Sequence, residues 1–252
     1  MIEIHNLSLG YGERKLITDA NVCIGDGRLT ALIGRNGSGK STMLRAIAGL
    51  NPDYKGRIIL NGSLSKGMSS EQMAKNLAFV STERTRIPNL RCRDVVATGR
   101  APYTNWIGRL QKKDLEIVEY SFEAVGISDF ADKTMDKMSD GECQRVMIAR
   151  ALAQSTPIIL LDEPTSFLDL PNRYELCTLL ADLAHTENKC ILFSTHELDI
   201  AFSLCDSIAL IDTPHLYCLP TEEMRISGYI DQLFKNGSMT FDASSATVSI
   251  RK

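Results

Sequence analysis

The fold is decided by one stretch of the sequence, Gly34-Arg35-Asn36-Gly37-Ser38-Gly39-Lys40-Ser41. This stretch fits the pattern G-x-x-x-x-G-K-[ST]; an apolar run precedes it and helical periodicity follows it. In such a strand–loop–helix unit, glycines let backbone N–H groups face phosphate oxygens, and the helix N-terminus adds partial positive charge. The sequence therefore predicts a phosphate-binding site made by Gly34, Arg35, Asn36, Gly37, Ser38, Gly39, Lys40, Ser41 and Thr42.

Two residues of this loop are expected to act on the phosphates directly. The Lys40 ammonium group would lie between the β- and γ-phosphates of a nucleotide, which makes it a candidate catalytic residue. The Ser41 hydroxyl would ligate Mg²⁺. A phosphate loop alone is compatible with many classes of nucleotide hydrolase, so further motifs must narrow the class.

A second apolar strand, Ile158–Leu161, is followed directly by Asp162 and Glu163. Ligands bind at the carboxyl ends of parallel strands, so both carboxylates should face the phosphates. We expect Asp162 to hold Mg²⁺ through water, and Glu163 to orient or deprotonate the attacking water. Together with the phosphate loop, this pair predicts a nucleotide hydrolase.

Short apolar strands alternate with helical segments along most of the chain, which predicts a parallel sheet covered by helices on both faces. From about Thr82 to Ala153 the pattern is mostly helical and predicts an inserted subdomain. Its first strong periodicity comes from four apolar residues, Leu115, Val118, Phe122 and Val125. The C-terminal end has weak patterning, except that residues 239–242 and 247–250 predict a small hairpin.

Composition excludes several classes of protein. The 252 residues carry a formal net charge of −3, so the basic surplus of nucleic-acid-binding proteins is missing. We find no apolar run of the roughly 18 residues that a membrane span needs, and no signal-peptide profile after Met1. The seven cysteines contain no C-x-x-C pair, which favours reduced thiols over disulfides or a zinc site. We therefore expect a cytosolic protein unless a partner holds it at a membrane.

The segment Ser139-Asp140-Gly141-Glu142-Cys143-Gln144-Arg145 narrows the class, because it resembles the signature motif of the ABC ATPase family. It precedes the strand that carries Asp162, as the family requires. The family usually has Gly at the position of Asp140 and often Gln at that of Glu142. Ser139 and the Gly141 amide would cap a helix whose N-terminus can hold a γ-phosphate. The alternative is an ordinary capped helix.

Three further segments resemble motifs of this family, and the resemblance covers roughly residues 2 to 212. Ser166-Phe167-Leu168-Asp169 resembles the D-loop, with Asp169 as a nucleotide-site residue. Ser194-Thr195-His196-Glu197 resembles the switch segment, in which His196 would contact the γ-phosphate and act in catalysis. Tyr11 resembles the aromatic residue that stacks on adenine, although a turn tyrosine is the alternative.

One position departs from the family pattern. A Gln that reaches Mg²⁺ usually ends the strand found here at residues 77–81, and this chain has Thr82 followed by Glu83. Either Thr82 takes the role of this metal-contacting residue through its hydroxyl, or Glu83 does so.

The resemblance implies a fold class and an assembly. The implied fold would be an α/β P-loop NTPase core with a mixed, mainly parallel sheet, an N-terminal antiparallel β part and an inserted helical subdomain. The ATPase domain would span residues 1–220, the helical insertion about 84–155 and a short C-terminal extension 221–252. Two chains would form a head-to-tail homodimer that holds ATP and Mg²⁺ between Lys40 of one chain and Ser139 of the other. Dimer closure would drive transport.

The class of ABC protein follows from domain features that this sequence lacks and from the segment at residues 95–103. There is no tandem cassette, no long heptad insert and no fused membrane span, which favours a separate transporter subunit. Residues 95–103 resemble importers for iron-siderophores, haem and cobalamin, as do residues 151–154 and a tail with Phe234 and Phe241-Asp242. The expected partners are membrane permease subunits and, through them, a substrate-binding protein, at the cytoplasmic face of the inner membrane. The alternatives are another ABC transporter or a non-transport ABC ATPase.

Two features leave alternatives open. Arg84, Arg86, Arg91 and Arg93 form either a solvated charged face or a docking surface for a permease or anionic headgroups. Cys143 lies about one turn into the signature helix. Its thiol is either activated by the helix N-terminus and shielded by ATP, or buried in the helical subdomain and inert.

Overall fold

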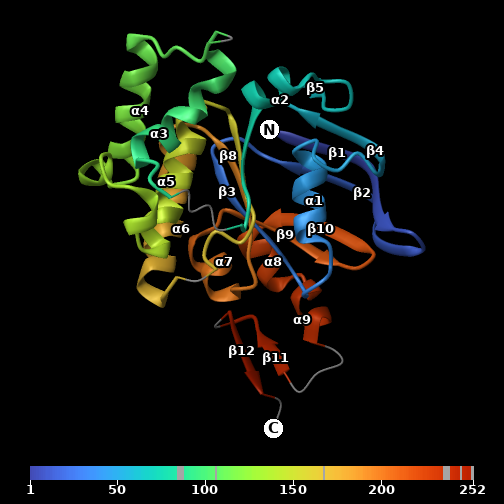
Figure 1. Cartoon of the computed structure of the whole chain (residues 1–252). Helices are drawn as coiled ribbons and strands as arrows, with labels where there is room; N and C mark the ends of the chain where they lie inside the picture. The colour runs from blue at the N-terminus through green and yellow to red at the C-terminus, as the bar shows by residue number, and fades with distance from the viewer. Residues whose placement is uncertain (84–87, 106, 167, 235–238, 245, 251–252) are drawn as a thin grey trace.

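A mixed sheet forms the centre of the molecule in the computed structural model, which describes residues 1–83, 88–105, 107–166, 168–234, 239–244 and 246–250 (Figure 1). Within these residues its strand order is β10-β9-β3-β8-β7-β6, and only β10 pairs antiparallel to its neighbour. The predicted mainly parallel sheet is therefore confirmed. Its strands are β3 (Arg28–Gly34), β6 (Leu77–Val80), β7 (Ile158–Leu161), β8 (Cys190–Ser194), β9 (Ser207–Asp212) and β10 (His215–Pro220).

The N-terminal part forms a second, antiparallel sheet, as predicted. The strand order is β2-β1-β4-β5, and α1 and α2 lie on this side of the molecule (Figure 1). One apolar cluster joins this sheet to α1 and to one face of the large sheet, with Met43 and Leu32 among its buried members. The elements are β1 (Ile2–Tyr11), β2 (Arg14–Ile24), β4 (Tyr54–Leu60), β5 (Ser63–Leu64), α1 (Lys40–Ile47) and α2 (Ser70–Asn76).

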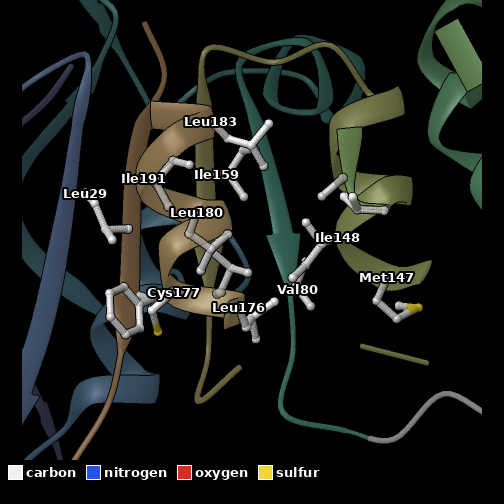
Figure 2. Packing of buried hydrophobic residues seen from close by; sticks show 14 of the residues in the cluster. Leu29, Val80, Met147, Ile148, Ile159, Leu176, Cys177, Leu180, Leu183 and Ile191 are labelled. Atoms are coloured by element: carbon white, nitrogen blue, oxygen red, sulfur yellow. The ribbon is translucent and has the colours of Figure 1, made fainter. Parts of the chain in front are cut away.

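The opposite face of the large sheet is covered by helices of a second apolar cluster. Figure 2 shows Leu180 and Leu183 of α6 beside Ile159 and Ile191 of the sheet. Along β7, alternate residues belong to different clusters: Ile159 to this one, Ile158 to the first. Both faces of β7 are buried, which explains its continuous apolar sequence. The helices on this side include α5 (Asp140–Ala153), α6 (Leu170–Thr186) and α7 (Leu198–Leu204).

The helical insertion packs through α5 and is held by one buried ion pair. Arg100 Nε lies 2.9 Å from Asp114 Oδ1, and Arg100 Nη1 donates to the Ala153 carbonyl at 2.8 Å. On α4, Val118 and Phe122 are buried, as the periodicity predicts. Leu115 is 49% exposed, so it lies outside the buried face of this helix. The remaining elements here are α3 (Cys92–Ala97), α4 (Lys112–Ala124) and the 3₁₀ turns η1 (Thr98–Tyr103), η2 (Ser128–Phe130) and η3 (Met135–Lys137).

Part of the arginine-rich segment is paired on the surface. Arg93 Nε lies 3.1 Å from Asp132 Oδ1, and Arg91 lies 3.6 Å from the same atom. Arg84 and Arg86 lie outside the described residues. Within the described residues, every helix is too short or too polar to traverse a lipid bilayer.

The C-terminal segment packs on the large sheet and on α7. Phe241 stacks on Phe202 with ring centroids 5.2 Å apart, and Tyr229 stacks on Tyr217 at 3.8 Å. The predicted hairpin is present with the predicted bounds. The elements are α8 (Thr221–Ile226), α9 (Tyr229–Phe234), β11 (Met239–Asp242) and β12 (Thr247–Ile250).

Candidate active site

The phosphate loop connects β3 to α1 and turns through left-handed glycines. Gly39 precedes the helix with φ 107°, and a Cβ added there would lie 3.1 Å from the Leu16 side chain. Only glycine combines this backbone conformation with this close packing. Arg14 donates to the Gly37 carbonyl at 2.9 Å and so ties β2 to the loop, a contact that the sequence did not indicate.

Lys40 is buried at the start of α1, where its Nζ donates to the Gly34 carbonyl at 3.0 Å. Burial lowers the pKa of Lys40, while the charges of Glu163 and Asp162 act in the opposite direction. The ammonium group therefore lies among the predicted catalytic groups in a partly desolvated place, where an added phosphate would be a strong partner.

Asp162 is the centre of a hydrogen-bond network at the carboxyl end of β7. Its Oδ1 accepts from Ser41 Oγ at 3.0 Å and from Ser194 Oγ at 2.7 Å. Asp162 is 3% exposed and Ser194 is fully buried. The network joins the phosphate loop to two strands of the sheet, and it places two of the predicted metal ligands, Ser41 and Asp162, side by side.

Glu163 follows with a strained backbone. Its φ of 48° lies in the left-handed region, which costs free energy for a residue with a Cβ. The Glu163 N–H donates to Ser194 Oγ at 2.8 Å, and its carbonyl accepts from the Ser166 hydroxyl. The half-buried carboxylate is close enough to Lys40 to influence the pKa of that group. The turn thus directs the chain sharply away from the sheet directly after the acid pair.

Two other predicted residues, Thr82 and His196, follow the carboxyl ends of strands that are parallel to β7. Thr82 lies two residues beyond Val80, which pairs with Leu161 of β7, and Glu163 lies two residues beyond Leu161 on that neighbouring strand. Thr82 is partly buried, whereas Glu83 is exposed. His196 lies two residues beyond the end of β8, and it is exposed.

The outer parts of the loop face different neighbours. The Tyr11 hydroxyl lies 3.2 Å from Thr42 Oγ1, while the ring is 62% exposed beside the loop. Asn36 is exposed and Ser38 is buried. Arg35 Nε donates to the Leu233 carbonyl at 2.9 Å, so this side chain is bound to the last residues of α9. No sequence pattern indicated that contact, because its partners are 198 positions apart in the chain.

The signature residues begin α5. Ser139 is the N-cap: its Oγ accepts from Glu142 N at 3.3 Å, and its own N–H donates to Glu142 Oε2 at 2.7 Å. Gly141 lies against Leu168, and Asp169 caps α6 through Asn172 N at 3.1 Å. Phe167 lies outside the described residues.

The helices α5 and α1 belong to clusters on opposite faces of the sheet. The chain therefore brings together Lys40, Ser41, Asp162, Glu163 and Ser194, while the helix that carries Ser139 packs on the other face.

Comparison with protein families identifies the class of this fold and site. A model of the ABC transporter family matches residues 17–166, which is more than half of the chain. The chain belongs to the ABC transporter family. The predicted family is thereby confirmed, and the similarity to solved ABC cassettes confirms the predicted fold class.

Curated relatives agree with this assignment. An uncharacterised ABC transporter ATP-binding protein of Methanocaldococcus jannaschii is 42% identical over 211 residues, which cover 84% of this chain and 73% of that protein. The iron(3+)-hydroxamate import ATP-binding protein FhuC of Bacillus subtilis is 36% identical over 200 residues, 79% of this chain and 74% of that protein. Among solved structures, the dimeric structure of a bacterial ABC transporter cassette matches with a TM-score of 0.74 and 25% identity, over 88% of this chain and 99% of that one.

Proposed function

We propose that this chain is the ATP-binding and ATP-hydrolysing subunit of an ABC importer, with a substrate from the iron-siderophore, haem and cobalamin group. The observation that carries the enzymatic part is the network that links Ser41, Asp162, Ser194 and Glu163 beside the Lys40 ammonium group. A hydroxyl, a carboxylate and a cation in this arrangement suit a phosphate chain, and a second carboxylate suits its water nucleophile.

In this proposal the chain's own groups act on ATP by position and charge. Lys40 leaves the Gly34 carbonyl and binds the β- and γ-phosphates, and the backbone N–H groups of the loop bind their oxygens. Glu163 orients the attacking water and accepts its proton. His196 contacts the γ-phosphate from the end of β8, and the exposed Tyr11 ring stacks on adenine.

The donor set at Asp162 fits Mg²⁺. The ion prefers oxygen ligands and keeps several waters, so Ser41 and Asp162 would complete its shell together with phosphate and water oxygens. Within the described residues no group of three or more His, Cys, Asp or Glu side chains is arranged to hold a metal ion. Bound Mg²⁺ would neutralise charge on the phosphates.

Thr82 is the better substitute for the missing Gln of the family. It is partly buried and follows the end of its strand by two residues, as Glu163 does on the neighbouring strand, whereas Glu83 is exposed. A hydroxyl at this position can hydrogen-bond a metal-bound water without adding a negative charge.

The site is completed by a second copy of the chain. The helix carrying Ser139 and Gly141 packs on the opposite sheet face from α1, so its N-terminus would serve the ATP of a partner. Asp169 would lie at the same interface. The similarity to a cassette with a dimeric structure supports this head-to-tail homodimer.

The transport assignment rests on the relative that is an iron-hydroxamate import ATP-binding protein and on the importer-like residues 95–103. The partners would be integral membrane permease subunits and, through them, a substrate-binding protein. The chain would act peripherally at the cytoplasmic face of the inner membrane.

The test is extraction of the tagged chain from membranes of its own host, followed by identification of co-purifying proteins and uptake assays with iron-siderophore, haem and cobalamin. We expect an integral membrane protein to co-purify and one uptake activity to require ATP hydrolysis. Co-purification of ribosomes or nucleic acid, without a membrane protein, would contradict the proposal. The matched control for the loss of a carboxylate in Glu163→Gln is Glu116→Gln, which makes the same change at an exposed site on α4.

A further inference from the structure

Ser194 is the last residue of β8, and its side chain is fully buried between two strands that end at the active site. In the parallel pairing of β7 with β8, Leu161 is opposite Phe193. The next residues along each strand, Asp162 and Ser194, are therefore neighbours. This register places the Ser194 hydroxyl beside the end of β7, where Asp162 and Glu163 follow the strand.

One oxygen atom of Ser194 connects both acidic residues. Ser194 Oγ donates its single hydrogen to Asp162 Oδ1 at 2.7 Å, and it accepts from the Glu163 N–H at 2.8 Å. Because a hydroxyl has one hydrogen, both bonds can form only with this direction of donation. The bonds fix the Asp162 carboxylate and the backbone of Glu163 relative to one another.

The bond to Glu163 also stabilises an unfavourable backbone conformation. The left-handed φ of 48° at Glu163 persists only if its surroundings hold it. Among the described residues no other side chain accepts from this N–H, and the nearby Thr195 hydroxyl instead accepts from Glu197 N at 3.1 Å. Replacement of Ser194 by Ala would leave the Glu163 N–H without its partner and free the turn.

We infer that Ser194 is a positioning residue for ATP hydrolysis. It fixes the position of the Glu163 carboxylate relative to Asp162 and to the Mg²⁺ that Asp162 would hold. The inference rests on the roles proposed above for Asp162 and Glu163. Ser194 does not touch the nucleotide, so its loss should lower turnover and leave ATP affinity nearly unchanged. A role in folding alone would instead lower thermal stability with unchanged kcat.

The matched control lies on the neighbouring strand. Thr30 of β3 is opposite Leu192 of β8, and its buried hydroxyl has no hydrogen-bond partner among the described residues. Thr30→Val therefore removes a buried hydroxyl from the same sheet, keeps the side-chain volume and breaks no hydrogen bond within the described part of the chain. We expect this variant to keep the kcat and KM of the unchanged protein.

The experiment compares the unchanged 252-residue chain with Ser194→Ala, Thr30→Val, Glu163→Gln and the double variant Ser194→Ala/Glu163→Gln. ATP Kd is measured by calorimetry, kcat and KM by phosphate release, and folding by thermal unfolding. For Ser194→Ala we expect kcat to fall about tenfold or more with Kd changed less than about threefold, as for loss of a hydrogen bond to a charged group. Because Ser194 acts through Glu163, the double variant should be no slower than Glu163→Gln alone.

The outcomes separate the two proposals. Normal hydrolysis by Glu163→Gln would overturn the proposed function of that residue. Slow hydrolysis by Glu163→Gln, together with a Ser194→Ala kcat within about threefold of the unchanged protein, would overturn the positioning role alone. A multiplicative loss in the double variant would also overturn it, because independent sites add in free energy.

Discussion

Two regions of this chain are proposed to bind ATP, and they are built in opposite ways. The phosphate-loop face, defined as Lys40, Ser41, Asp162, Glu163 and Ser194, joins one helix to two strands by bonds between residues up to 121 positions apart. The signature end, defined as Ser139, Gly141 and Glu142, is closed by two bonds between residues three positions apart.

The difference lies in what each region can offer to an anion. The phosphate-loop face is largely buried and holds a cation beside its carboxylates. At the signature end, the Glu142 carboxylate already accepts the Ser139 N–H, and this bond lowers the pKa of Glu142. A helix N-terminus attracts anions, and at the N-terminus of α5 the Glu142 carboxylate already lies in this position. The two regions therefore predict mutational effects of different size.

The largest effect is expected at Glu163. Changing Glu163 to Gln keeps the hydrogen-bonding shape but removes the group that accepts a proton from water. Turnover should fall about a hundredfold or more, with ATP binding retained, because positioning and charge stabilisation carry this reaction. Phosphate release and calorimetry measure the two quantities, and an ATP-bound dimer should accumulate on size-exclusion chromatography. Turnover close to that of the unchanged protein would remove Glu163 from the site.

Lys40→Ala should have the next largest effect, on affinity. Removal of the ammonium group should weaken ATP binding by about 2–4 kcal/mol, as for a buried charged hydrogen-bond donor. Lys112→Ala, at a side chain that is 92% exposed on α4, is the control for loss of one positive charge. Equal ATP affinities of these two variants by calorimetry would contradict the proposed phosphate contact.

A smaller effect of opposite sign is expected at the signature end. Glu142→Gln keeps an acceptor for the Ser139 N–H but removes a negative charge that would face the partner's γ-phosphate. In a Glu163→Gln background, the ATP-bound dimer should form at a protein concentration lower by about three- to tenfold, the range of a like-charge contact near the surface. Analytical ultracentrifugation with ATP measures this concentration.

The pH dependence sharpens the same prediction. The pKa of Glu142 is lowered, so its carboxylate stays charged as the pH falls from neutral towards the ordinary range of a glutamate. Mild acidification should therefore fail to reproduce the effect of Glu142→Gln. Tighter dimerisation between about pH 7.5 and 6 that is present in the unchanged sequence and absent in Glu142→Gln would contradict the charge-based explanation, since an ordinary glutamate titrates lower still.

The smallest effect is expected at Cys143. Its thiol is buried, with Sγ 3.6 Å from the Met135 carbonyl and 3.9 Å from that of Met138. Of the two alternatives that the sequence allowed, the structure agrees with the buried thiol, and we predict that this thiol is inert. Maleimide should label Cys143 slowly with or without ATP, while exposed Cys23 reacts as the internal reference. Peptide mass spectrometry that found equal rates at these two thiols would contradict the burial.

Several features were predictable because they depend on local sequence. The phosphate loop, the acid pair after a buried strand and the hairpin at residues 239–250 each follow from spacing within a few residues. The start of α5 at Ser139 follows from the capping pattern of Ser139 with Glu142. By contrast, the exposure of Leu115 was not predictable from its helical spacing, since the periodicity does not say how wide the buried face is.

What the sequence determined alone is the chemistry available at each strand end: a lysine, a hydroxyl, two carboxylates and a histidine in fixed order along the chain. What only the tertiary structure decided is which of these groups touch. Ser194 meets Glu163 across 31 residues, and Arg35 meets Leu233 across 198, because strand order and register are set by packing of both sheet faces. A side-chain pattern records local geometry, whereas a contact between distant residues depends on how all intervening elements pack.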